Sequence, residues 1–236
     1  DPEMSRGLGD VYKRQIIMQA KSKIALNTIV LYLKLLISIA CSLISTRWVL
    51  EALGSEDFGV YNLVAGIIAM FSFLNSSMSA ATQRFLSIAA GKSKPIEVHK
   101  IFVCSLYLHL FIAILVLLLF ELGGLYLINN VMVIPNSKYD DALIVLHFMS
   151  ISSFFTIISA PYQAAITTHE ALHIYAFTGV LESICKLLVA FILLNYLGNR
   201  LVLYTVCMMM VSINSFFIVW PVSYTHLRAH ETSQDL

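Results

Sequence analysis

Long apolar stretches alternate with short polar connectors along most of the chain, which has 236 residues. A helix of about 20 mostly apolar residues is long enough to cross the hydrocarbon core of a membrane. The sequence offers six stretches of this kind, at about 24–46, 58–81, 101–120, 142–162, 174–195 and 201–221. Glycine, proline and charged residues gather in the connectors, as they do in turns. The pattern predicts an all-α membrane protein with six transmembrane helices.

The composition agrees with a chain that lies mostly in lipid. Hydrophobic residues make up 58% of the sequence and charged residues only 12%, whereas soluble domains carry about 25% charged residues. The formal net charge is +1, which leaves no excess of basic residues for binding nucleic acid. We therefore expect membrane lipids to surround the chain, and we expect no nucleic acid among its partners.

The two ends of the chain are polar and differ from its apolar middle. Residues 1–15 and 222–236 resemble the translated adapter tails found on reading frames from sequence assemblies. We expect these segments to be non-native tails that flank a six-helix transmembrane lobe at 16–221. The protein would then continue past Pro221, and the chain would be a fragment.

Lysine and arginine residues are distributed unevenly among the connectors. If the N-terminus lies in the cytoplasm, the inner segments contain six of them and the outer segments three. The inner residues are Lys21, Lys23, Arg84, Lys92, Lys94 and Lys100, and the outer ones are Arg47, Lys138 and Arg200. Because cytoplasmic loops are enriched in these residues, we expect a cytoplasmic N-terminus. Six helices then return the C-terminus to the same side.

Lys34 is a charged residue inside the first predicted helix, about 15 Å from its start and so near the membrane midplane. A lysine at this depth costs about 2.5–3.5 kcal/mol on insertion scales. It shares one face of the helix with a stripe of small polar residues: Asn27, Ser38, Ser42 and Ser45. This face either lines a water-filled cavity or packs against another helix through small polar groups.

A second polar stripe follows one face of the second predicted helix and ends beside Arg84. Its members are Ser72, Asn75, Ser76, Ser79 and Gln83. Their small hydroxyl and amide groups suit close helix packing as well as contact with the hydroxyl groups of a sugar. Arg84 and Arg47 lie near the ends of predicted helices, where each could instead anchor the chain at the membrane interface.

Glu182 and Lys186 are four residues apart in the fifth predicted helix. An acid placed four residues before a lysine can form an ion pair that lowers the cost of burying both charges. In the alternative interpretation, Glu182 relays protons or cations and Lys186 contacts an anion. The spacing alone does not choose between these roles.

The segment HEALH matches the H-E-x-x-H pattern of zinc metalloproteases. In a membrane metalloprotease His169 and His173 would bind zinc, and Glu170 would be the general base. The sequence offers no credible third ligand, since Ala176 and Gly179 stand where the extended pattern requires glycine and histidine. We expect no metal, no cofactor and no enzymatic activity, and we keep the protease as a minor alternative.

Several segments together resemble a known transporter family. Residues 46–66 read TRWVLEALGSEDFGVYNLVAG, and residues 71–86 read FSFLNSSMSAATQRFL. They resemble the N-terminal signature of bacterial polysaccharide biosynthesis proteins, the O-antigen and capsule flippases of the multidrug/oligosaccharidyl-lipid/polysaccharide exporter superfamily. SAPYQAAITTHEALHIYA at 159–176 and ESICKLL at 182–188 resemble later segments of the same family, in the same order. HEALH then becomes a family loop feature.

The resemblance implies a fold and a function. Family members have two six-helix lobes around a central cavity, so this chain corresponds to the N-terminal lobe of such a transporter, with the C-terminal lobe missing. The family moves undecaprenyl-pyrophosphate-linked oligosaccharide across the bacterial inner membrane. By analogy, the pyrophosphate would contact Lys34, Arg47, Arg84 and Lys186. Glu182 would be a possible ion-coupling residue.

A drug/cation antiporter of the same superfamily is the alternative function. Such a transporter needs acidic residues in its cavity to bind organic cations. Glu182 is the only acid well inside a predicted helix, so the sequence favours the flippase.

Overall fold

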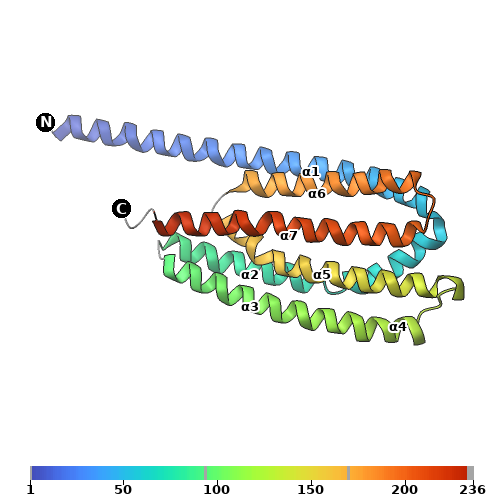
Figure 1. Cartoon of the computed structure of the whole chain (residues 1–236). Helices are drawn as coiled ribbons and strands as arrows, with labels where there is room; N and C mark the ends of the chain where they lie inside the picture. Colours follow the sequence, from blue (N-terminus) through green and yellow to red (C-terminus); the bar gives the residue numbers. More distant parts are fainter. Residues whose placement is uncertain (1, 93–94, 169–170, 233–236) are drawn as a thin grey trace.

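The computed structural model describes residues 2–92, 95–168 and 171–232, which form a bundle of long helices (Figure 1). Helices follow one another along the chain without any strand in these ranges. They are α1 (Pro2–Ala69), α2 (Ser72–Gly91), α3 (Pro95–Leu119), the π-helix η1 (Phe120–Gly124), α4 (Leu125–Asn130), the 3₁₀ helix η2 (Asn136–Lys138), α5 (Tyr139–Thr168), α6 (Leu172–Asn195) and α7 (Arg200–Thr232).

Five helical segments of the described chain are long and apolar enough to cross a membrane. They are Ala25–Ala69, Ile96–Asn130, Asn136–Thr168, Leu172–Asn195 and Arg200–Pro221. The all-α membrane architecture predicted from the hydrophobic pattern is therefore confirmed. The predicted number of six helices is only approximate, because the first two predicted spans are organised differently.

The chain reverses direction inside α1, at Gly54. Its backbone angles, φ 73° and ψ 177°, are not helical, and the segment 55–69 and α2 run back toward the end of the bundle where the N-terminus lies (Figure 1). The segment Ala25–Ala69 thus contains the first predicted helix and the beginning of the second.

The second predicted helix, at 58–81, is not continuous. A turn at Met70 and Phe71 separates the end of α1 from α2. In this turn the Phe71 amide donates to the Ile68 carbonyl at 3.1 Å, a shorter connection than the helical one. The second pass through the bundle therefore consists of two helical pieces joined by two residues.

The third predicted helix is longer than its apolar pattern indicates. The predicted end at 120 is wrong, because η1 and α4 continue the helix to Asn130. Gly123 and Gly124 lie in η1 and do not end the helix. A Cβ atom at Gly124 would come within 2.6 Å of Leu146 Cδ1, so this glycine allows η1 to pack closely on α5.

Polar contacts hold together the segments between helices at the Gly54 end of the bundle. The Arg200 guanidinium donates to the Ala52 carbonyl at 2.8 Å, which lies beside the break in α1. Lys138 forms an ion pair with Asp57 at 2.6 Å. The connectors that follow the first, third and fifth predicted helices therefore meet at one end, as an alternating topology requires.

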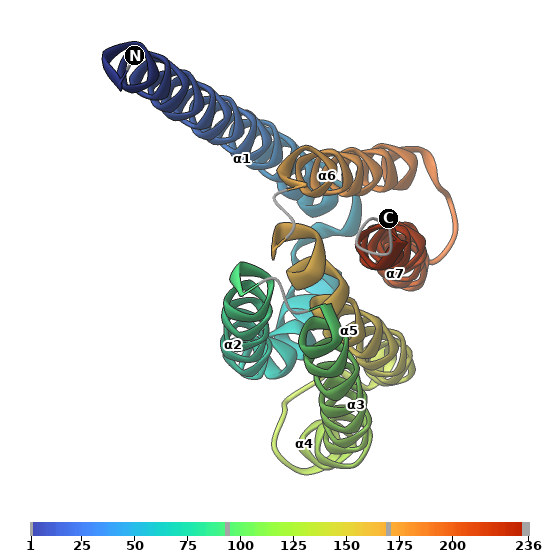
Figure 2. The ribbon, with the colours of Figure 1, turned by 90° about the vertical axis from the view of Figure 1, so that its left-hand side faces the viewer.

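The helices pack in two groups, seen end-on in Figure 2. α6 packs mainly on α1, whereas α5 packs on α7, α3 and α2. Apolar clusters of side chains from several helices stabilise the packing. One near the Gly54 end includes Val49, Val145 and Leu193, and one toward the other end includes Leu86 and Ile166.

We predict that Gly54→Ala destabilises the chain by about 1–3 kcal/mol, since its backbone region is open almost only to glycine. No atom would lie within 4 Å of the added Cβ, so the cost would come from the backbone alone. Gly59→Ala is the matched control, because Gly59 is helical and its added Cβ also meets nothing within 4 Å. Thermal unfolding in detergent should show the loss for Gly54→Ala only. Equal stability of both variants would contradict this explanation of the reversal.

Candidate functional site: a polar seam between the helices

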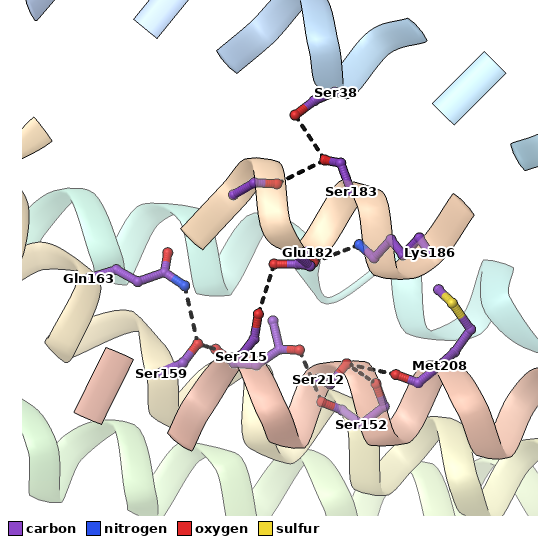
Figure 3. Close-up of polar contacts among 12 residues, drawn as sticks. Ser38, Ser152, Ser159, Gln163, Glu182, Ser183, Lys186, Met208, Ser212 and Ser215 are labelled. Carbon is purple, nitrogen blue, oxygen red and sulfur yellow. Dashed lines mark hydrogen bonds and ion pairs between the residues drawn. The ribbon is translucent and has the colours of Figure 1, made fainter. Parts of the chain in front are cut away.

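Polar side chains connect α1, α6, α7 and α5 through the interior of the bundle (Figure 3). The Ser38 hydroxyl of α1 lies 2.9 Å from that of Ser183 on α6. Glu182, next to Ser183, accepts a hydrogen bond from Ser215 of α7 at 3.1 Å. One turn away on α7, Ser212 lies 2.7 Å from Ser152 of α5. We call this set the polar seam: Ser38, Ser183, Glu182, Lys186, Ser215, Ser212 and Ser152.

Lys34 points at α6. Its Nζ atom lies 3.5 Å from the centre of the Tyr175 ring, a cation–π distance. A Cβ atom at Gly179 would lie 2.3 Å from Lys34 Cε, so the glycine leaves the space that the lysine chain occupies. Lys34 therefore packs at a helix interface, which is one of the two surroundings that the sequence allows.

The contact with α6 also gives the position of Lys34 along that helix. At 1.5 Å per residue, Gly179 lies about 10 Å from the start of α6, a helix about 36 Å long. Lys34 therefore lies about 10 Å from one end of α6 and about 8 Å from its middle, and its position near the membrane midplane stays a prediction. Lys186 lies about 10 Å further along the same helix.

The Glu182–Lys186 ion pair predicted from their spacing is present. Lys186 Nζ lies 2.6 Å from Glu182 Oε1, and the side chains are 42% and 35% exposed. Ser45 of α1 donates to the Lys186 carbonyl at 3.4 Å. The carboxylate of Glu182 is thus neutralised by its neighbour and held by Ser215.

The four predicted phosphate-binding cations do not form one cluster. Lys34 and Lys186 both lie where α1 meets α6. Arg47 of α1 and Arg84 of α2 are exposed, and no hydrogen bond or ion pair described for this structure connects either arginine to the polar seam. From the first stripe, Asn27 and Ser38 are half-buried and Ser42 is exposed.

The second polar stripe divides into two parts. Ser72 and Asn75 line a pocket of about 200 Å³ between α1, α2, α3, α5 and α7. Ser76 and Gln83 are exposed, and Ser79 is half-buried outside the pocket lining. Ser152 of the polar seam also lines this pocket, which connects the two features.

Glu121 is a polar residue of the bundle that the apolar pattern of the sequence does not indicate. This acid lies in η1, where it accepts a hydrogen bond from Ser150 and lies 2.6 Å from His147 Nδ1. It was overlooked because the third apolar stretch was taken to end at 120. His147, inside the fourth predicted helix, was the available signal, since a histidine among apolar residues requires a polar partner.

The H-E-x-x-H segment lies only partly within the described residues. His169 and Glu170 lie outside the described residues. Ala171, between the two histidines, is not helical (φ −77°, ψ 49°), and His173 is exposed in the first turn of α6. The zinc pattern requires its histidines one turn apart on one helix. Among described residues, no three His, Cys, Asp or Glu side chains are grouped as metal ligands.

The chain is similar to the uncharacterized membrane protein EpsK of Bacillus subtilis (strain 168). The two are 29% identical over 131 residues, which is 55% of this chain and 26% of EpsK. The chain thus spans about a quarter of the length of that curated relative. No family model matches it, and no solved structure matches it. With its long apolar helices, the chain is a multi-pass membrane protein.

We predict that Tyr175→Leu destabilises the chain by about 0.5–2 kcal/mol through loss of the cation–π contact. Tyr175→Phe should keep most of the stability because it keeps the ring. The control is to repeat both substitutions in a Lys34→Met background, where the ring has no cation to bind. Thermal unfolding in detergent should then show a smaller difference between Leu and Phe. The same difference with and without Lys34 would show that the ring acts only by packing.

Proposed function

We propose that this chain is the N-terminal lobe of a flippase for undecaprenyl-pyrophosphate-linked oligosaccharide in the bacterial inner membrane. The proposal is supported by the resemblance of residues 46–66 and 71–86 to polysaccharide exporters and by the similarity to a bacterial membrane protein. The observation that carries it is Lys34, a half-buried lysine at the contact of two apolar helices, α1 and α6, that has no acidic partner among the described residues.

An anionic pyrophosphate would give Lys34 a stronger partner than Tyr175. A charge-assisted hydrogen bond to a phosphate oxygen is about twice as strong as a neutral one, so the flexible lysine would leave the ring when the anion arrives. Lys186 lies further along the same interface and could take over contact with the anion. Arg47 and Arg84 are exposed. Each would contact the substrate either on the side that faces the C-terminal lobe or at the membrane interface.

The state of the acids inside the bundle favours an anionic substrate over an organic cation. Glu182 is paired with Lys186, and Glu121 is paired with His147. A drug/cation antiporter needs a carboxylate that is available to the cation, and each of these two already has a basic partner. The antiporter remains the alternative, and ion coupling through Glu182 would require its ion pair to open.

We further propose that the N-terminus is cytoplasmic, on the basis of the lysine and arginine distribution. In a cysteine-free background, Ser55→Cys and Gly91→Cys place a thiol on exposed residues at opposite ends of the bundle. An impermeant maleimide should label position 55 in intact spheroplasts and position 91 only after permeabilisation. The reverse labelling would refute the proposed orientation.

The function is tested by substituting Lys34 in the full-length protein and measuring surface polysaccharide in a flippase-deficient strain. We expect near-normal membrane abundance for Lys34→Arg, Lys34→Gln and Lys34→Glu. Arg should restore polysaccharide partly or fully because it keeps the charge, whereas Gln and Glu should not. Lys23→Gln, outside the polar seam, serves as the matched control for loss of one positive charge. Full rescue by Lys34→Gln at equal abundance would show that transport does not need the positive charge of Lys34.

A further inference from the structure

The pocket of about 200 Å³ meets the polar seam at Ser152, but neither Lys34 nor Lys186 lines it. The break between α1 and α2 forms one wall, with Phe71 and Asn75 on it, and α3, α5 and α7 form the others. No Asp, Glu, Lys, Arg or His side chain lines it. Its chemistry therefore differs from that of the cationic interface.

The serine and threonine hydroxyl groups of the pocket already donate hydrogen bonds within the protein. Four of them donate to a backbone carbonyl three or four residues earlier on the chain, at 2.7–3.0 Å: Ser72, Ser153, Thr156 and Thr205. Ser212 donates to the Met208 carbonyl, so Ser152 is the donor in their shared bond. These five serine and threonine hydroxyls of the pocket are thus left with lone pairs that can accept a hydrogen bond.

Asn75 adds an acceptor that has no partner. Its Oδ1 atom is buried and makes no hydrogen bond in the structure. Leaving a buried acceptor unsatisfied costs about 1–3 kcal/mol, so a ligand that donates to Oδ1 would recover that cost. The pocket is therefore built to receive several hydrogen-bond donors.

The remaining walls select among molecules that carry donors. Phe71 and Phe120, packed edge to face with centroids 5.1 Å apart, present apolar surface together with Met149, Met208 and Met209. A phosphate has no donors to offer, and an organic cation would find no carboxylate. A sugar ring offers hydroxyl donors along its rim and apolar C–H groups on its faces, which match both kinds of wall.

We propose that this pocket binds a neutral sugar ring, separately from the cations that would hold a pyrophosphate. The inference rests on the proposed function for the identity of the substrate, a lipid-linked oligosaccharide. It adds that the glycan enters the lobe itself, between α2, α5 and α7. The two chemical halves of the substrate are then recognised at two different places on this chain.

The test measures binding of methyl β-glucopyranoside to the purified 236-residue chain in detergent by saturation-transfer NMR. Glucuronate and tetraethylammonium serve as anionic and cationic probes. We expect saturable binding of the neutral glycoside, and binding about tenfold weaker in Asn75→Leu and in Thr156→Val, the cost of about one hydrogen bond. Ser76→Ala, on the same helix but outside the pocket, should bind normally.

Three results would overturn the proposal: no saturable glycoside binding by the folded chain, equal binding in all three variants, or tighter binding of tetraethylammonium than of the glycoside. Thr156→Val keeps the side-chain shape, so it remains informative if Asn75→Leu fails to fold. The outcome is independent of the Lys34 experiment. Rescue of polysaccharide without glycoside binding would reject the pocket alone, and binding without rescue by the unsubstituted protein would reject the transport function alone.

Discussion

Within lipid, backbone amides and carbonyls have to be satisfied by the chain itself, and this requirement shapes the whole bundle. At a helix break, another group of the chain can take up a released carbonyl. At Gly54 this group is Arg200, which donates to the Ala52 carbonyl and thereby ties the start of α7 to the reversal in α1. The serine and threonine hydroxyls follow the same rule, because most of them donate to the backbone of their own helix.

Hydropathy predicted the fold class and most helix positions because lipid demands long uninterrupted apolar helices. It did not predict where helices bend or continue. The hydrophobic pattern places Gly54 in a polar connector, whereas its backbone conformation lets α1 reverse at a single non-helical residue. Gly124 was read as part of a connector, although its role is close contact with Leu146. The sequence alone does not distinguish these two roles of glycine, because they depend on the backbone conformation and on how close the neighbouring helix lies.

Helical periodicity predicted part of the site and could not predict its partners. The spacing of Glu182 and Lys186 was sufficient for their ion pair, because both residues lie on one helix. The partner of Lys34 is Tyr175, which is 141 residues away along the chain. Such a contact depends on which helices pack together. The same limit applies to the second stripe, where Asn75 enters a pocket and Gln83 stays exposed although both follow one periodic pattern.

The two-residue turn at Met70 and Phe71 divides the second pass through the bundle into two helices joined by a hinge. A continuous helix would pass any tilt of one half to the other, whereas a joint at a helix end absorbs the change in a few backbone angles. Ile68 and Asn75 stand on opposite sides of this joint and both face the pocket. A change of backbone angles at this turn would move Ile68 relative to Asn75 and so change the shape of the pocket. The Asp57–Lys138 ion pair lies outside the turn, in the connectors at the Gly54 end of the bundle.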